Sequence, residues 1–170
     1  MTAAEASTLI HMPDLPGNST PQSWADLGSG SGLFTRTLLT QLPPGSTVYA
    51  IDRDEVPAPS AGIVSRQADF TAHNWQTPPL HGILMANSLH FVKDHKAFLQ
   101  KAADTLLPAA RFLYVEYDTD TPNPWVPYPL SFKTLQQLFR SLQLGEARLL
   151  HTMPSRFGGA QLYSAMVTLR

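Results

Sequence analysis

The sequence predicts an α/β fold in which a mostly parallel sheet carries helices on both faces. Three features predict it: apolar runs of strand length alternate with helical patterns, a glycine-rich turn follows the first run, and an acid ends the second. At 170 residues the chain has the size of one domain, so we expect a single unit over residues 1–170. Within it, residues 1–21 are expected as an N-terminal extension and residues 118–130 as a proline-rich loop.

The individual elements follow from local patterns. Apolar runs bounded by proline, glycine or polar residues predict strands at 23–27, 47–52, 62–67, 81–86 and 111–116. Apolar residues at helical spacing predict helices over 32–41, 94–106 and 131–143. Asp94 is a candidate N-cap for the second helix, and Pro108 should end it. Near the C-terminus, runs at 147–153 and 162–169 predict two strands joined around Gly158 and Gly159.

The turn after the first strand carries glycine at every second position. Gly28, Gly30 and Gly32 permit positive φ angles and the close approach of a ligand. The helix that follows presents free backbone N–H groups at its start. Asp52 ends the next strand, where its two oxygens can accept hydrogen bonds from both hydroxyls of a ribose. Loop and acid together predict a nucleoside-binding crevice, and the alternative is a glycine-rich turn without a ligand.

The glycine spacing discriminates between nucleotide ligands. A dinucleotide fingerprint reads G-x-G-x-x-G, but Leu33 occupies its third glycine position. A P-loop needs a Lys-Ser or Lys-Thr pair after the glycines, and the sequence has none there. The pattern therefore disfavours pyrophosphate recognition, leaving an NAD(P)-dependent oxidoreductase as the less favoured reading.

Residues 22–170 resemble the class I S-adenosylmethionine-dependent methyltransferases. The resemblance lies in five segments taken in order: 26–32, 49–52, 67–70, 82–92 and 107–117. It implies a Rossmann-like, doubly wound sheet of seven mostly parallel strands with an antiparallel last strand. The crossover helices should be partly missing, because residues 53–61 contain Pro57 and Pro59, and residues 71–80 contain Pro78 and Pro79. With a short N-terminal cap, the pocket should be open, and a homo-oligomer could exclude water from it.

The resemblance also implies S-adenosylmethionine as cofactor, with S-adenosylhomocysteine as product. Nine residues are expected to bind it: Asp26, Gly28, Ser29, Gly30, Gly32, Asp52, Asp69, Phe70 and Asn87. The glycine loop would pack on the amino-acid part, whose ammonium Asp26 would help to fix, and Asp52 would hold the ribose. Asp69 and the Phe70 backbone would meet the adenine, and the Asn87 carbonyl would line the methionine part. Asp26 and Asp69 could instead be a strand-end cap and a turn residue.

Methyl transfer is an in-line displacement, so a base is needed only when the acceptor loses a proton. His90 follows the fourth strand and is the candidate base; the alternative is a hydrogen-bonded wall residue. In the loop 118–130, Trp125 and Tyr128 offer flat apolar faces to an acceptor, or fold onto the core as part of a connector.

Composition limits the partners. With 12 basic and 13 acidic residues, the net charge of −1 predicts no nucleic-acid footprint. No apolar run is long enough for a membrane span and the N-terminus lacks the features of a secretion signal, so we expect a cytoplasmic protein. The absence of cysteine excludes thiolate chemistry, and the histidines lack metal-ligand spacing, so no metal is expected.

The expected function is therefore S-adenosylmethionine-dependent methyl transfer to a small-molecule or unassigned acceptor. The alternative from another class is a non-catalytic module that binds S-adenosylmethionine or S-adenosylhomocysteine. The acceptor atom stays open, because oxygen, nitrogen, sulfur and carbon are all methylated on this fold.

Overall fold

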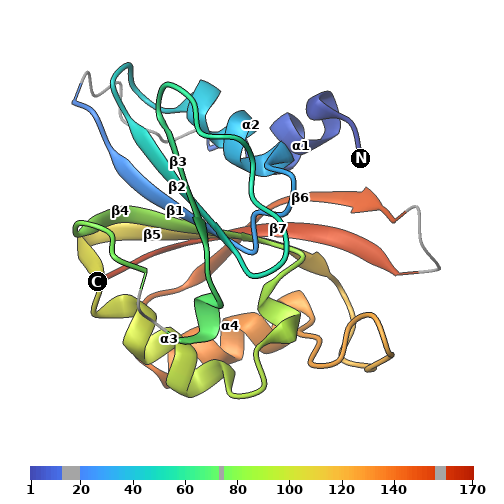
Figure 1. The fold of residues 1–170 in the computed structure, drawn as a ribbon. Helices are drawn as coiled ribbons and strands as arrows, with labels where there is room; N and C mark the ends of the chain where they lie inside the picture. The colour runs from blue at the N-terminus through green and yellow to red at the C-terminus, as the bar shows by residue number, and fades with distance from the viewer. Residues whose placement is uncertain (13–19, 73–74, 156–159) are drawn as a thin grey trace.

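A seven-stranded sheet forms the centre of the computed structural model, which describes residues 1–12, 20–72, 75–155 and 160–170 (Figure 1). The strand order across the sheet is β3-β2-β1-β4-β5-β7-β6. The strands are β1 (Ser23–Leu27), β2 (Thr47–Asp52), β3 (Ile63–Gln67), β4 (Leu80–Ala86), β5 (Leu106–Tyr117), β6 (Ala147–Pro154) and β7 (Gln161–Thr168).

The first five strands pair in parallel, and β7 pairs antiparallel with both β5 and β6. This confirms the predicted doubly wound sheet with an antiparallel last strand. The strand order reverses between β1 and β4, where a crevice opens at the carboxyl ends of the strands. The turn predicted at Gly158 and Gly159 lies outside the described residues.

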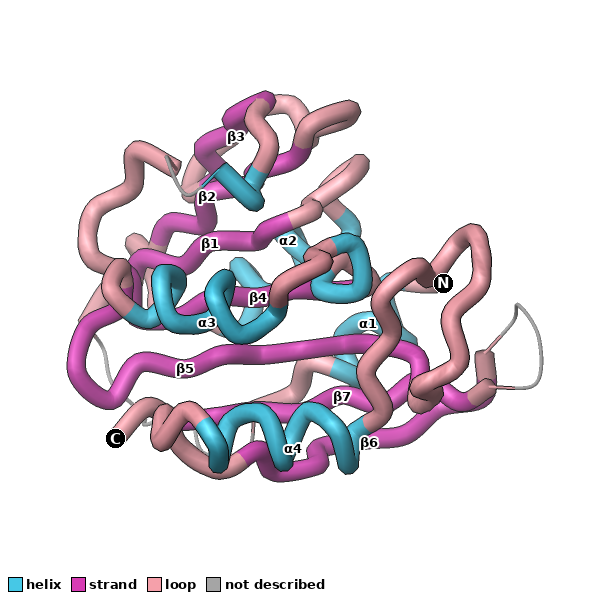
Figure 2. The backbone as a smooth tube through the Cα atoms, turned by 90° about the horizontal axis from the view of Figure 1, so that it is seen from below, coloured by secondary structure: helices cyan, strands magenta, loops and turns pink. Residues whose placement is uncertain are grey.

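Two helices cover each face of the sheet. The helices α1 (Ala3–Leu9) and α2 (Leu33–Gln41) lie on one face, and α3 (His95–Ala103) and α4 (Phe132–Ser141) lie on the other (Figures 1 and 2). Each pair of helices seals its own apolar core against the sheet. Two short 3-10 helices, η1 (Phe70–Ala72) and η2 (Leu89–Phe91), follow β3 and β4 near the carboxyl edge.

The centre of the sheet depends on one close approach between neighbouring strands. Trp24 on β1 is fully buried, and its indole N–H donates to the Gln22 side chain at 2.8 Å. Its ring covers Gly82 on β4, where an added Cβ would lie 2.5 Å from the ring atoms. Gly82 is therefore needed where β1 and β4 lie side by side beneath the crevice.

The sequence analysis assigned no helix to residues 1–21, and α1 is an element that it missed. Thr2 and Glu5 form a capping box at its start, with reciprocal bonds of 3.2 and 2.7 Å. Leu9 and Ile10 are fully buried against the sheet. The extension is thus partly a packed helix, held in place by burial of its apolar face.

The helix predicted over 94–106 ends at Ala103, three residues before its predicted end. The strand predicted from residue 111 begins at Leu106, five residues earlier. Asp94 caps the helix as expected, through a 2.9 Å bond from the Ala97 N–H. Leu106 pairs with Leu80 of β4, which draws it into the sheet. Pro108 therefore lies in a strand and does not end the helix; the register shift between Leu80 and Gly82 lies opposite this segment.

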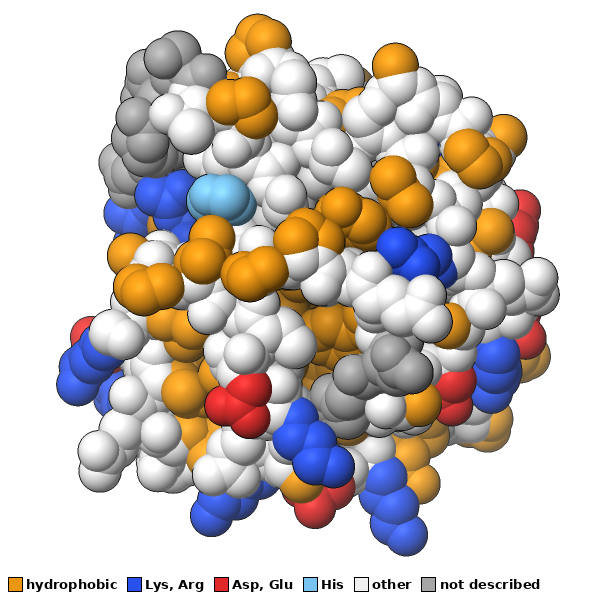
Figure 3. Space-filling model, turned by 60° about the vertical axis from the view of Figure 1, so that its left-hand side comes forward, with side chains coloured by type: hydrophobic (Ala, Val, Ile, Leu, Met, Phe, Trp, Pro, Cys, Tyr) orange, Lys and Arg blue, Asp and Glu red, His pale blue; other side chains and the backbone are white. Residues whose placement is uncertain are grey.

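Both expected gaps in the crossovers are confirmed in the described residues. Between β2 and β3 no helix forms, and between β3 and β4 there is only η1. No helix of the described chain has the length and hydropathy needed to cross a membrane. On the face shown in Figure 3, basic side chains are spread among acidic ones and form no single patch.

Candidate functional site

The glycine loop between β1 and α2 has the predicted backbone conformation, but its glycines serve different purposes. Gly28 and Gly32 have φ angles of 81° and 87°. A Cβ on Gly28 would lie 2.4 Å from the Ser88 Cβ, and one on Gly32 would lie 2.6 Å from the Pro57 Cβ. Only Gly30 has open space around it, with nothing within 4 Å of an added Cβ. Two of the three glycines thus permit internal packing, and Gly30 is the one that a ligand can approach.

Asp52 ends β2 and is tied to the loop. Its Oδ2 accepts a 2.9 Å hydrogen bond from the Gly30 N–H, and its Oδ1 accepts bonds from the N–H groups of Asp54 (2.9 Å) and Glu55 (3.3 Å). A carboxylate offers about four acceptor positions. One further donor can therefore bind without rearrangement, and a second would replace the long bond from Glu55.

A cavity of about 430 Å³ lies where the strand order reverses. Its lining is Gly28, Asp52, Arg53, Asp54, Asp69, Phe70, Thr71, Asn87, Ser88 and Phe91. Five of the nine predicted cofactor residues are among these; Asp26, Ser29, Gly30 and Gly32 lie beside or beneath the cavity. The sequence analysis missed Arg53, Asp54 and Thr71, which lie in the irregular crossovers, and Ser88 and Phe91, which lie at η2 after β4.

Asp26 lies beneath the loop and does not line the cavity. It is 1% exposed, and the Thr35 hydroxyl donates to its Oδ2 at 2.6 Å. Burial raises the pKa of Asp26 to about 7; the bond from Thr35 opposes this increase, and the negative charge of Asp52 adds to it. Asp26 therefore joins the end of β1 to α2, which agrees with the alternative that it is a cap at the end of the strand. Any contact between Asp26 and a ligand is indirect.

Asp69 and Phe70 lie at the start of η1. Asp69 Oδ1 accepts bonds from the Thr71 hydroxyl (2.7 Å) and N–H (2.9 Å), which lower the pKa of this exposed carboxyl. Asp69 thus acts as a turn residue and still presents its second oxygen to the cavity. The Phe70 carbonyl accepts from the Trp75 indole at 2.8 Å, which leaves one lone pair of this oxygen for a ligand.

Two polar atoms near the loop are buried and lack a hydrogen-bond partner among the described residues. They are the Ser29 Oγ and the Asn87 Oδ1. Asn87 has a positive φ of 54°, unusual outside glycine, and its N–H is fixed to the Val115 carbonyl at 2.7 Å. An orphaned buried polar atom is costly, and a polar ligand in this cavity could satisfy the Asn87 oxygen.

Comparison with known families gives this geometry a context. The sequence profile described as "Methyltransferase domain" matches residues 25–114, from the middle of β1 into β5. The chain belongs to the methyltransferase domain family. Membership confirms the resemblance to class I methyltransferases, with S-adenosylmethionine as the methyl donor. No curated protein sequence was found to match the chain.

Solved methyltransferase structures share the fold at low sequence identity. One is Burkholderia thailandensis 1,6-didemethyltoxoflavin-N1-methyltransferase, with TM-score 0.72, 20% identity, 98% of this chain covered and 77% of that one. A second is human N-acetylserotonin methyltransferase, with TM-score 0.69, 17% identity and coverages of 97% and 51%. A third is a methyltransferase from Aquifex aeolicus, with TM-score 0.64, 14% identity and both chains covered completely. All three are similar to this methyltransferase in fold.

The charge of the cavity suits the cationic cofactor of a methyltransferase. Its lining contains three carboxylates, Asp52, Asp54 and Asp69, and one guanidinium, Arg53. Arg53 is paired with Asp54 at 3.0 Å, so its charge is already compensated. A sulfonium ion fits this surface, whereas a pyrophosphate would be repelled.

The candidate base of the methyltransferase, His90, is held by a buried acid that the sequence analysis did not single out. His90 is 3% exposed and Glu116 is 1% exposed, and their side chains meet at 2.6 Å through Nδ1 and Oε2. Glu116 is the last residue but one of β5, and His90 lies in η2 after β4. The parallel pairing of β4 and β5 brings the two side chains together. His90 is thus a hydrogen-bonded residue behind Ser88 and Phe91, which line the cavity, and this position is consistent with both readings of its role.

The loop 118–130 of the methyltransferase folds beside η2. The Tyr128 N–H donates to the His90 carbonyl at 3.0 Å, and the Asp120 carboxylate fixes the start of α4 through Ser131. Trp125 remains 82% exposed and Tyr128 38% exposed. The aromatics therefore do not fold onto the core, which contradicts the connector alternative for Trp125.

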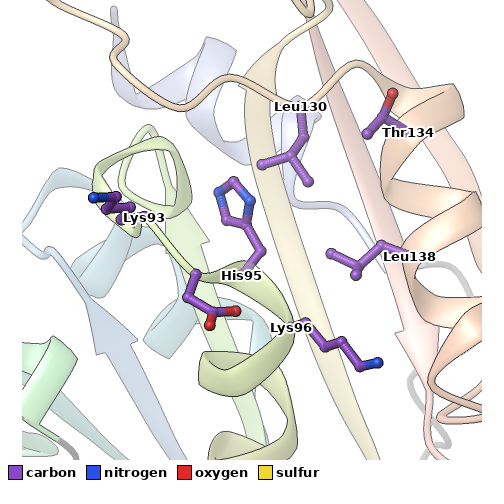
Figure 4. Close-up of a pocket in the computed structure, with 7 residues that line it drawn as sticks. Lys93, His95, Lys96, Leu130, Thr134 and Leu138 are labelled. Carbon is purple, nitrogen blue, oxygen red and sulfur yellow. The ribbon is translucent and has the colours of Figure 1, made fainter.

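A larger cavity, about 630 Å³, lies between α3 and α4 (Figure 4). His95 points toward Leu130 there, and burial lowers the pKa of its imidazole. This cavity contains neither the glycine loop nor a strand end, so we assign the ligand site to the smaller cavity. Among the described residues, no three His, Asp or Glu side chains cluster as metal ligands would.

Proposed function

We propose that this methyltransferase transfers a methyl group from S-adenosylmethionine to a small-molecule acceptor at the cavity between β1, β2 and β4. The observation that carries the proposal is the convergence of Gly28, Asp52, Asp69 and Asn87 on one cavity from the ends of four strands. These positions accommodate one extended nucleoside ligand.

The residues have separate roles in holding the donor. Asp52 accepts a ribose hydroxyl, and the open side of Gly30 receives the amino-acid part. Asp69 accepts from the adenine amino group with its free oxygen, beside Phe70. The orphaned Asn87 oxygen faces a polar group of the donor. Asp26 acts from below the loop, where its bond with the Thr35 hydroxyl holds the end of β1 against α2 without touching the ligand.

When bound, the cofactor supplies a methyl group on a sulfonium, an activated leaving group. The chain's own contribution is to align the acceptor with that methyl group and to exclude competing water. The exposed Phe91 ring lines the cavity, and the loop 118–130 lies behind it, joined to η2 by the bond from the Tyr128 N–H to the His90 carbonyl; we expect the acceptor to enter on this side. Similar structures named for didemethyltoxoflavin and N-acetylserotonin support a small-molecule acceptor.

The test is calorimetric titration of the purified protein with S-adenosylmethionine, S-adenosylhomocysteine, NAD and NADP. We expect micromolar binding of both adenosyl ligands and none of the dinucleotides, with a matching rise in melting temperature. Binding of dinucleotides alone would overturn the cofactor assignment for this cavity. Failure of all four ligands to bind would overturn the proposed site.

A further inference from the structure

Glu116 is a deeply buried acid near the cavity, and no role in binding the cofactor accounts for it. It is 1% exposed, at the carboxyl end of β5. Its Oε1 accepts the backbone N–H groups of Ser88 (3.0 Å), Leu89 (2.8 Å) and His90 (3.4 Å). Three N–H groups aimed at one oxygen make Glu116 a hydrogen-bond acceptor at the start of η2.

The second oxygen of Glu116 fixes the imidazole of His90. Oε2 lies 2.6 Å from Nδ1, and with the carboxylate as acceptor we assign the shared proton to Nδ1. In the neutral ring, Nε2 then carries the lone pair. A carboxylate that holds Nδ1–H both orients the ring and stabilises the imidazolium formed when Nε2 takes a proton.

Two aromatic rings lie close to the imidazole of His90. The Phe91 ring centroid lies 4.4 Å from that of His90, and the Tyr117 centroid lies 6.2 Å away. Phe91 is 54% exposed and lines the cofactor cavity. Tyr128, whose N–H binds the His90 carbonyl, is also exposed. Exposed flat apolar faces beside a cavity suit a planar ligand.

We infer that Glu116 positions His90 as the proton acceptor for a planar aromatic substrate whose reacting oxygen carries a proton, a phenolic hydroxyl. The inference rests on the proposed function and specifies its acceptor. A base is useful only if the acceptor must lose a proton, and the aromatic surroundings select a ring that bears the hydroxyl. Glu116 is a positioning residue, because it acts through His90.

The proposed step needs only the phenolic hydroxyl, the cofactor's methyl group and sulfur, and the imidazole of His90. The hydroxyl proton moves to His90 Nε2 as an oxygen lone pair forms the bond to the methyl carbon. The bond from that carbon to sulfur breaks, and its electron pair stays on sulfur, which becomes a neutral thioether. His90 becomes an imidazolium paired with the Glu116 carboxylate and returns its proton to solvent after product release.

The experiment compares two acceptors that differ in their need for a base. At about pH 8.5 phenol is still almost entirely neutral, whereas 4-nitrophenol is almost entirely ionised. Both are offered to the full chain with radiolabelled S-adenosylmethionine, as wild type, His90→Gln, Glu116→Gln and the matched control His151→Gln on β6. We expect both site variants to lose on the order of 100-fold in rate with phenol. They should change little with 4-nitrophenol, and His151→Gln should change neither.

A spectroscopic measurement on the protein alone tests the positioning role. Nitrogen NMR of His90 should show the proton on Nδ1 in wild type. In Glu116→Gln the amide can donate to Nδ1, so the proton should move to Nε2. A merely structural Glu116 would leave the ratio of phenol to nitrophenol rates unchanged, and that result overturns the inference.

The two proposals fail in different ways. If wild type does not bind S-adenosylhomocysteine in the calorimeter, the proposed function fails. If wild type and variants bind it equally but neither phenol is methylated, the phenolic acceptor is wrong and the cofactor site stands. Equal losses with both acceptors would show that His90 does not take the proton.

Discussion

The backbone N–H of Gly30 donates to Asp52 Oδ2 at 2.9 Å, and this bond joins the glycine loop to the end of the neighbouring strand. Asp52 therefore does two things in the site we propose: it shapes the loop and it faces the ligand. The same carboxylate fixes the start of the irregular crossover through the N–H groups of Asp54 and Glu55.

Replacing Asp52 with Ala should weaken binding of S-adenosylmethionine by about 1.5–3 kcal/mol, the range for hydrogen bonds to a charged group. Asp52→Asn keeps one acceptor oxygen for Gly30 and should lose less. Titration calorimetry measures both variants, with Asp104→Asn, an acid outside the cavity, as control. Unchanged affinity in Asp52→Ala would mean that the ribose binds elsewhere.

The glycines of the loop should differ in their tolerance of alanine. At Gly28, both the positive φ and the 2.4 Å approach of Ser88 oppose a Cβ, so Gly28→Ala should cost about 2–4 kcal/mol of unfolding free energy. At Gly30 only the backbone strain applies, and Gly30→Ala should cost about 1 kcal/mol. Urea unfolding of the two variants measures the difference. Equal costs would contradict the packing described here.

Asp26 should make stability depend on pH. Its folded pKa, about 7, exceeds the ordinary 3.8, so between these values the folded state holds a proton that the unfolded state has released. Stability is therefore lost as pH rises from about 4 to 7, by on the order of 4 kcal/mol, and then levels off. Asp26→Asn removes this loss.

The measurement is the unfolding free energy of wild type and Asp26→Asn from pH 4 to pH 9. The asparagine can still accept the Thr35 hydroxyl, so the bond at 2.6 Å need not be lost. The advantage of the variant should grow with pH up to about 7–8. A difference that is constant across this range would show that Asp26 is ionised throughout.

The N-terminal helix should contribute to the stability of the whole domain. Leu9 is fully buried, so Leu9→Ala should reduce the unfolding free energy by about 2–5 kcal/mol. Ser7→Ala, on the exposed side of the same helix, should cost under 1 kcal/mol, roughly the range for surface substitutions. Thermal unfolding distinguishes them, and similar melting temperatures would indicate that α1 does not pack as described.

Much of the fold could be predicted because strands and turns carry strong local signals. The segments of β1 and β2 are apolar and end at Gly28 and Asp52, and their predicted bounds are those observed. The start of β5 could not be predicted, because Leu106 continues the apolar spacing of the helix before it. Pairing with Leu80 decides its conformation. The first helix was predictable in principle from the capping box of Thr2 and Glu5.

The site residues at the ends of strands could be predicted from the sequence. The site residues that depend on pairing between distant side chains could not. Asp52, Asp69 and Asn87 line the cavity as expected. The partnership of His90 with Glu116 joins residues 26 positions apart, and no local pattern indicates it. Asp26 looks like a ligand contact in sequence, but Thr35 and the loop cover it.

The three tryptophans give the molecule built-in fluorescent reporters at different depths. Trp24, fully buried against Gly82, senses the integrity of the central strands. Trp75 is 3% exposed and donates to the Phe70 carbonyl at the rim of the cavity, so its emission should respond to an occupied nucleoside site. Trp125 is exposed to solvent, and its emission should shift to shorter wavelength only when an acceptor covers it. Single-tryptophan versions of this chain could therefore follow folding, donor binding and acceptor binding as separate optical signals.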